Sequence, residues 1–211
     1  MATRAEFIER TLRQIYGGYV SEDSSITPML VNSWLNDAIA LAAKTNYTDN
    51  LKLDGIGYVN NSFYTTFKGI SPVLDETNLW RLQLPQIPVG IGANEGINTI
   101  VFKDSNGTVS FPLIPLTANQ KTYFRSMRPI PNKTLFYNEG EFVYVVTSLA
   151  LNNYTASVTM VSGGDSSNLN STLNVPSDYF PTMVAYVQQQ LNIMKATPKD
   201  LTNDGQDLSQ N

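Results

Sequence analysis

The clearest hydrophobic pattern in the chain lies near its C-terminal end, between Val175 and Lys195. Apolar side chains recur there in steps of three or four residues, which predicts a helix with one continuous apolar stripe: Phe180, Met183, Val184, Val187, Leu191 and Met194. Ser177 and Asp178 precede Pro181, a residue that a helix accepts only in its first turn. We therefore expect the helix to begin near Pro181, capped by one of these two side chains.

Two further helices are predicted near the N-terminus. The first begins at a capping box formed by Thr3 and Glu6 and ends at Gly17-Gly18. The second begins at Thr27-Pro28, and the polar run Asn46–Asn50 is expected to end it. Their apolar stripes are Phe7, Ile8, Leu12 and Ile15 in the first helix, and Val31, Trp34, Leu35, Ala38, Ile39 and Ala42 in the second. We expect the core to include Met29, Trp34, Met183 and Met194.

The pattern changes to that of strands between residues 58 and 162. Segments rich in β-branched and aromatic residues predict strands at Tyr58–Phe67, Leu79–Leu84, Thr99–Phe102, Val109–Leu113, Thr134–Tyr137, Phe142–Val146 and Tyr154–Val161. Asp104–Gly107 and Asn138–Glu141 are expected to be hairpin turns, and Thr117–Met127 is a candidate short helix. About six to eight short strands are enough for a small sandwich or barrel.

These elements predict an α+β fold in four parts. Residues 1–57 form an N-terminal helical part, and residues 58–174 form an inserted antiparallel β body that resembles a sandwich or barrel. Residues 175–197 form a C-terminal helix that packs on the N-terminal helices as a small bundle, because it has few partners close in sequence. Residues 198–211 are expected to be an extended tail.

Composition narrows the function classes. The 211 residues are 42% apolar, which is ample for a core, but only 15% are charged, against about 25% in an average soluble domain. Neutral polar residues fill the difference, and they suit contacts with other proteins because burying an amide costs less than burying a charge. The net charge of −4 argues against a protein that grips nucleic-acid phosphates.

Histidine and cysteine are both absent from the sequence. Disulfides, thiolate nucleophiles, zinc–thiolate sites and imidazole bases are therefore excluded. The N-terminus has no apolar signal region, and no run approaches the roughly 18 apolar residues of a membrane span. We expect the protein to be made and folded in a cytoplasm.

Glycine-rich and acidic motifs offer only weak chemistry. Gly90–Gly96 lacks the spacing and the following helix of a phosphate-binding loop, and a connecting loop is the favoured interpretation. Gly163–Ser166 resembles a hydrolase serine motif, but no histidine exists to act as its base. Glu139 and Glu141 stand on one exposed hairpin tip, which cannot separate the pKa values of a glycosidase pair.

Two charged groups complete the candidates. The tail carboxylates Asp200, Asp204 and Asp207 lack the spacing of a calcium loop. Arg125 and Arg128 beside Tyr123 and Phe124 could stack on a base, but an anchor for a neighbouring acidic subunit is favoured in an acidic protein. We predict no catalytic, cofactor or metal site, and no enzyme activity.

The order of elements resembles virion neck proteins of tailed bacteriophages, in particular small ring or head–tail connector proteins of crAss-like and related short-tailed phages. The resemblance covers nearly the whole chain as architecture and loose motifs. The residues that carry it are Trp34–Ala38, Leu84–Pro88, Phe136–Tyr144, Val175–Asp178 and Asp200–Gly205.

The resemblance implies a structural virion protein that forms a ring, commonly of twelve subunits, docked on the portal. The ring would continue the DNA channel toward the tail without binding DNA specifically, and it would contact adjacent neck or tail rings. No clear portal-docking motif is present. A baseplate or tail-attachment protein and a carbohydrate-binding β-sandwich remain as alternatives, the second with an aromatic platform from Tyr58, Tyr64, Tyr137 and Tyr144.

Overall fold

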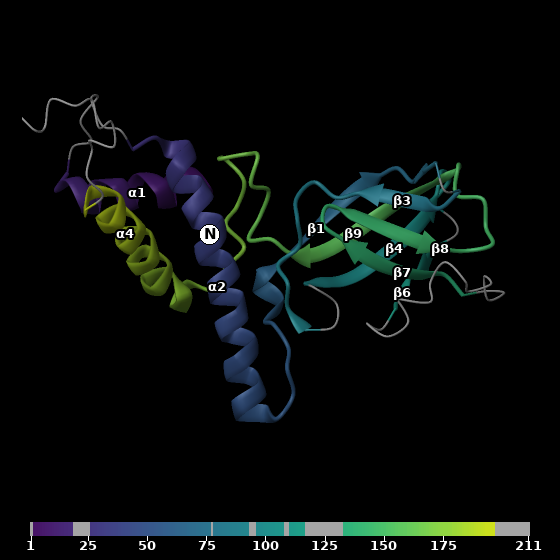
Figure 1. The fold of residues 1–211 in the computed structure, drawn as a ribbon, viewed down its shortest axis with the longest axis horizontal. Helices are drawn as coiled ribbons and strands as arrows, with labels where there is room; N and C mark the ends of the chain where they lie inside the picture. Colours follow the sequence, from purple (N-terminus) through teal and green to yellow (C-terminus); the bar gives the residue numbers. More distant parts are fainter. Residues whose placement is uncertain are drawn as a thin grey trace, which may run out of the picture.

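The computed structural model describes residues 2–18, 26–76, 78–92, 96–107, 110–116 and 133–196. Its α-helices are α1 (Arg4–Tyr16), α2 (Pro28–Asp54) and α4 (Phe180–Ala196), with short 3₁₀ turns η1 (Asn61–Phe63) and η4 (Ser177–Tyr179). Its strands are β1 (Tyr64–Ile70), β2 (Val73–Leu74), β3 (Trp80–Gln83), β4 (Ile97–Asp104), β5 (Ser110–Pro112), β6 (Ile114–Pro115), β7 (Leu135–Glu139), β8 (Phe142–Val146) and β9 (Tyr154–Val161). Figure 1 shows the helices on one side of the molecule and the sheets on the other.

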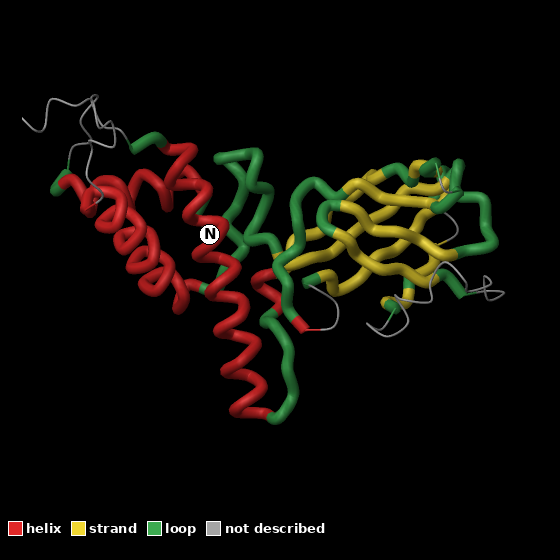
Figure 2. Tube along the Cα trace, in the orientation of Figure 1, coloured by secondary structure: helices red, strands yellow, loops and turns green. Residues whose placement is uncertain are grey.

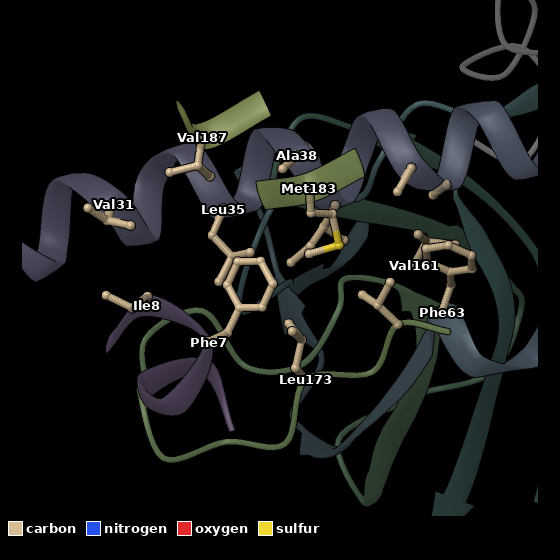
Figure 3. Packing of buried hydrophobic residues seen from close by; sticks show 14 of the residues in the cluster. Phe7, Ile8, Val31, Leu35, Ala38, Phe63, Val161, Leu173, Met183 and Val187 are labelled. Carbon is tan, nitrogen blue, oxygen red and sulfur yellow. The ribbon is translucent and has the colours of Figure 1, made fainter. Parts of the chain in front are cut away.

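The helical part joins both ends of the described chain, which confirms the predicted α+β fold. α1 begins at the predicted capping box of Thr3 and Glu6, and ends at Gly17, whose φ of 69° is left-handed. α4 packs mainly on α2, and the Phe7 and Phe180 rings meet edge to face at 5.7 Å. The bundle core contains side chains from all three helices, among them Leu35, Met183 and Val187 (Figure 3).

A buried arginine fixes α1 to the rest of the helical part. Arg4 is fully buried, and its guanidinium donates to the side-chain oxygens of Asn32 and Asn36 on α2 and to the carbonyl of Gly163. Asn32 in turn donates to the carbonyl of Ser166. The backbone next to Arg4 pairs with the same loop, because the Arg4 and Ala5 amides donate to carbonyls in residues 162–174. The segment that leaves the sheets is thus tied to the N-terminus.

The two sheets form a sandwich with a second core. One sheet has the strand order β1-β9-β4-β5, and the other has the order β2-β3-β8-β7-β6. All pairs are antiparallel except β6–β7, which is parallel. Alternate residues of both sheets are buried together, among them Leu82, Phe102, Val143 and Val158. Both predicted hairpins form, β4–β5 and β7–β8.

The sandwich edges carry features that discourage further strand pairing. β1 has a register irregularity between Phe67 and Ile70, and it carries an exposed Lys68. β2 has only two residues, while β5 ends in Pro112 and β6 in Pro115, which lack an amide hydrogen. Such edges are typical of proteins that avoid edge-to-edge association. Addition of a further strand at these edges is therefore disfavoured.

The second helix is longer than predicted. α2 continues through the polar run Asn46–Asn50 to Asp54, and Gly55, with φ of 71°, ends it. The Asn46 side chain is buried and forms hydrogen bonds with other segments of the chain. This polar residue therefore makes tertiary contacts and does not end the helix. The expected strand at Tyr58–Phe67 begins only at Tyr64, because residues 61–63 form η1.

Several smaller predictions were also wrong. Ser177 and Asp178 lie within η4, so neither side chain caps α4. Met29 is 79% exposed and Met194 is 37% exposed, whereas Met183 is buried as predicted and Trp34 is partly buried against the core. The described residues contain nine strands, more than the expected six to eight, since the two-residue strands β2 and β6 give no periodic signal. The candidate helix Thr117–Met127 lies outside the described residues.

Substitution of Gly164 by alanine is expected to lower the free energy of unfolding by about 2–4 kcal/mol. Gly164 has φ of 101°, and a Cβ there would lie 2.4 Å from the Thr172 carbonyl oxygen. Gly140→Ala is the matched control, because Gly140 also has a positive φ but has open space around it. Urea unfolding of both variants measures the difference, and equal losses would contradict the close contact.

Candidate assembly surface at the end of the second helix

The last turns of α2 project away from α1 and α4, and only the segment that follows the helix runs beside them (Figure 2). Three large aliphatic side chains are exposed there: Leu51 by 45%, Leu53 by 82% and Ile56 by 68%. Residues 51–56 are called the α2 tip below. Single exposed aliphatic residues are common, and Leu51 and Leu53, two positions apart, lie on different sides of the helix; what distinguishes this end is that three such residues surround it.

The way in which α2 ends explains why two of these three positions are apolar. The Gly55 amide donates to the Leu51 carbonyl, the hydrogen bond of a left-handed helix end. Such ends often bring together the apolar residues that correspond to Leu51 and Ile56. Leu53 has no role in that motif, and it is the most exposed of the three. Helix capping therefore does not account for the exposed position of Leu53.

The α2 tip is held by side-chain amides. Asn46, eight residues before the end of α2, donates to the Tyr179 hydroxyl on η4, and its oxygen accepts from the Asn60 amide and from Asn50. Asn50 also donates to the Tyr58 carbonyl. These hydrogen bonds hold the segment that follows α2, called the returning segment below, against the helix. The backbone that carries the exposed aliphatic side chains is therefore held in place.

Two tyrosines also hold the segment that follows α2 in place. The Tyr58 hydroxyl donates to Asp54 at 2.8 Å, and this hydrogen bond raises the pKa of Tyr58. Tyr47 lies against the backbone of Gly57, where a Cβ would come within 2.3 Å of the ring. Gly57 therefore lets the returning segment approach α2 closely.

A cavity lies between this support and the sandwich. Its volume is about 380 Å³, and the tyrosines Tyr47, Tyr58 and Tyr64 line it together with Ile91 and Asn98. Burial raises the pKa of Tyr64. Gly92 and Gly96 also line it, and we assign it no ligand.

A second set of exposed apolar side chains lies at the other end of the helical part. Met29 stands in the first turn of α2, while Ile193, exposed by 54%, and Met194 stand in the last turns of α4. Figure 1 places the start of α2 and the end of α4 away from the α2 tip. These three residues are called the bundle end below.

Leu53→Lys is expected to leave the free energy of unfolding within about 0.5 kcal/mol of the native value, because Leu53 is almost fully exposed. Lysine near a helix C-terminus also agrees with the helix dipole. Ile87→Lys, at a position 68% exposed in the β part, is the matched control. A clear loss in urea unfolding for Leu53→Lys alone would show that the α2 tip is an internal packing site.

The glycine-rich candidates have structural roles where they are described. Gly163 and Ser166 supply the carbonyls that bind Arg4 and Asn32. Gly92 and Gly96 both have positive φ and line the cavity. The rest of the Gly90–Gly96 loop includes residues 93–95, outside the described ranges.

The charged candidates do not form a site in the described residues. Glu139 and Glu141 are both exposed at the β7–β8 hairpin. Across the described ranges, no group of three acidic side chains is arranged to hold a metal ion. The remaining candidates lie outside these ranges: Tyr123, Phe124, Arg125, Arg128, Asp200, Asp204 and Asp207.

The four tyrosines of the proposed carbohydrate platform separate into two groups. Tyr137 and Tyr144 stack on each other across β7 and β8, with ring centroids 5.0 Å apart. Tyr58 and Tyr64 line the cavity beside the other sheet, and Tyr58 lies in no strand. A single platform built from all four is therefore wrong.

The sequence pattern did not reveal the α2 tip, because the polar run Asn46–Asn50 predicted an earlier end of the helix. Gly55, followed by the apolar Ile56, was the available signal for the true helix end. Arg4 was missed as well, since one charged residue in an amphipathic first turn ordinarily faces solvent.

Comparison of the chain with protein-family models and with curated proteins gives no significant match. Among the described residues, no helix is long and apolar enough to cross a bilayer.

Proposed function

We propose that this protein is a structural virion protein, a subunit of the ring that connects the portal to the tail in the neck of a tailed bacteriophage. Twelve or a similar number of copies would surround the DNA channel. The portal and the adjacent neck or tail rings would be its other partners, and it would have no catalytic role. The phage assignment rests on the resemblance of the element order to crAss-like and related connector proteins.

The observation that supports an assembly role is that the α2 tip is exposed although hydrogen bonds hold it in place. Leu53 and Ile56 remain largely exposed although Asn46 and Asn50 fasten the segment around them. A chain with only 15% charged residues pays little desolvation energy when such a surface is covered by another protein. The bundle end supplies a second apolar surface, as repeated association requires.

The net charge of −4 supports a channel role in one further respect. DNA phosphates are repelled by an acidic lumen, so DNA would pass during packaging and ejection without being held. A baseplate subunit would share the apolar contacts but not the twelve-fold ring. The separation of the four tyrosines leaves no specific observation in favour of carbohydrate binding.

Mass photometry of the purified protein over a range of concentrations tests the proposal. Twelve chains of 23.4 kDa give a closed oligomer of about 281 kDa. Discrete species near that mass are expected. Closed trimers or hexamers would support the baseplate alternative instead. A species that stays monomeric with an isolated portal ring present would contradict both forms of assembly.

A further inference from the structure

We propose that Asn106 is a site of spontaneous covalent modification, at which the side chain loses its amide and the backbone can become β-linked. The site lies in the turn between β4 and β5. Asn106 is followed by Gly107, and no other asparagine among the 211 residues is followed by glycine. Asparagine is also one of the thermolabile residue types of proteins. The proposal is independent of the proposed function, because the reaction needs only the chain and water.

The reaction joins a backbone nitrogen to the neighbouring side chain. The Gly107 nitrogen gives its proton to a base in the solvent and forms a bond to the Asn106 Cγ. The bond between Cγ and Nδ2 then breaks, and the amide group takes up a proton and leaves as ammonia, so a five-membered succinimide ring remains. Water opens this ring at either carbonyl carbon, which gives an ordinary aspartate or a β-linked isoaspartate.

The turn leaves both reacting groups accessible to solvent. Asn106 and Gly107 are exposed, and a Cβ added to Gly107 would meet no other atom within 4 Å. A side chain at this position would cover part of the attacking nitrogen, whereas glycine leaves it open. Gly107 has a φ of 69°, which the turn requires and glycine adopts without strain. The residue that closes the turn is therefore also the residue that exposes Asn106 to attack.

One hydrogen bond restrains the reaction in the folded chain. The Gly107 amide donates to the Asp104 carbonyl at 2.8 Å, and this bond must open before the nitrogen can reach the side chain. It lies beyond the last residue pair of the hairpin, Lys103 with Ser110, so its opening breaks no pair between β4 and β5. Local openings at such exposed ends cost far less free energy than global unfolding. The reaction should therefore be slower in the folded chain than in the unfolded chain, but not blocked.

A second dipeptide that could form the same ring is held more firmly. Asp54-Gly55 ends α2, where the Gly55 amide donates to the Leu51 carbonyl and the Asp54 carboxylate accepts from the Tyr58 hydroxyl. Attack by the Gly55 nitrogen would require both bonds to open. An ionised carboxylate is also a poorer electrophile than a neutral amide. We therefore expect Asn106 to react while Asp54 remains unchanged.

The modified chain is expected to remain folded. The turn is exposed, and β5 is a strand of three residues at the edge of its sheet. Both products carry a carboxylate where the native chain has a neutral amide. Each modified chain therefore becomes one unit more negative than the native −4, and the new charge lies two residues from Asp104.

Peptide mass spectrometry of the full chain, after incubation in warm and mildly alkaline buffer, tests the proposal. Heavy-oxygen water marks each ring opening, and fragmentation of the peptide separates aspartate from isoaspartate. We expect both products at position 106, formed at least tenfold faster than at Asn170, an exposed asparagine that is followed by Ser171. Gly107→Ala is expected to slow the conversion of Asn106 at least tenfold. Its added Cβ has open space, and urea unfolding shows whether this variant is folded.

Three results would overturn the proposal. Conversion of Asn106 in the urea-unfolded chain but not in the folded chain would show that the hydrogen bond to Asp104 blocks the site. Equal rates at Asn106 and Asn170, or an unchanged rate in folded Gly107→Ala, would show that the turn and its glycine do not create a reactive position. Aspartate without any isoaspartate would show direct hydrolysis of the amide in place of ring formation.

Discussion

Replacing Arg4 by methionine is expected to lower the free energy of unfolding by about 2–4 kcal/mol, because buried acceptors lose their donor. The guanidinium is fully buried and donates to Asn32, Asn36 and the Gly163 carbonyl. Methionine fills much of the same space but donates no hydrogen bond, so these buried oxygens lose their donor. The loop 162–174 would lose the bond between Gly163 and Arg4, and only the bond from Asn32 to the Ser166 carbonyl would then join its side to α2 by a side chain.

The charge of Arg4 is itself a cost to folding. Burial lowers the pKa of Arg4 from its ordinary value to about 10, and the nearby Asp165 carboxylate opposes this shift. Because the folded pKa lies below the unfolded one, the cost is present at every pH below about 10 and falls only as the pH rises above 10 toward the ordinary pKa of arginine. Between pH 6 and 9, Arg4 therefore adds no pH dependence to stability.

Urea unfolding at pH 7 measures the effect of Arg4→Met. Arg10→Met is the matched control, because Arg10 lies on the same helix and is exposed. We expect the control to change the free energy of unfolding by less than about 0.5 kcal/mol. Equal stability of the two variants would contradict the structural role assigned to Arg4.

Asn46→Ala is expected to lower the free energy of unfolding by about 2–4 kcal/mol. Asn46 is 4% exposed, and its side chain bonds Tyr179, Asn50 and the Asn60 amide. Alanine leaves the Asn60 amide without this acceptor and the Tyr179 hydroxyl without this donor. The segment that returns from the α2 tip would also become less firmly held, which should weaken assembly.

Thr45→Ala is the control for Asn46→Ala, since Thr45 is the exposed neighbour on the same helix. Hydrogen exchange provides the second readout, because faster exchange confined to residues 47–60 would show that the last turns of α2 and the segment after them have loosened. Unchanged stability and exchange in Asn46→Ala would show that the amide contacts do not hold this segment.

The sequence predicted the fold class and most elements because their signals are local. The capping box at Thr3, the glycine in each hairpin and the apolar stripe of α4 all act within a few residues. The end of α2 was wrong for a physical reason. Asn46–Asn50 has the composition of a helix end, but Asn46 and Asn50 bind segments distant in sequence, and a single sequence does not show such partners.

The candidate surface could be predicted only in part. Leu53 and Ile56 are ordinary core residues by type, and only the projection of α2 beyond α1 and α4 leaves them exposed (Figure 2). The same limit applies to Met29, whose place in the apolar pattern of α2 suggested a core position. Exposure depends on where neighbouring helices end, and that is a property of the packed structure.

Class-averaged electron microscopy of the assembled protein tests the central claim most directly. If the chain is a neck ring subunit, the particles will be closed rings of about twelve copies around an open hole wide enough for duplex DNA. Solid particles without a central hole, or open filaments, would contradict the account.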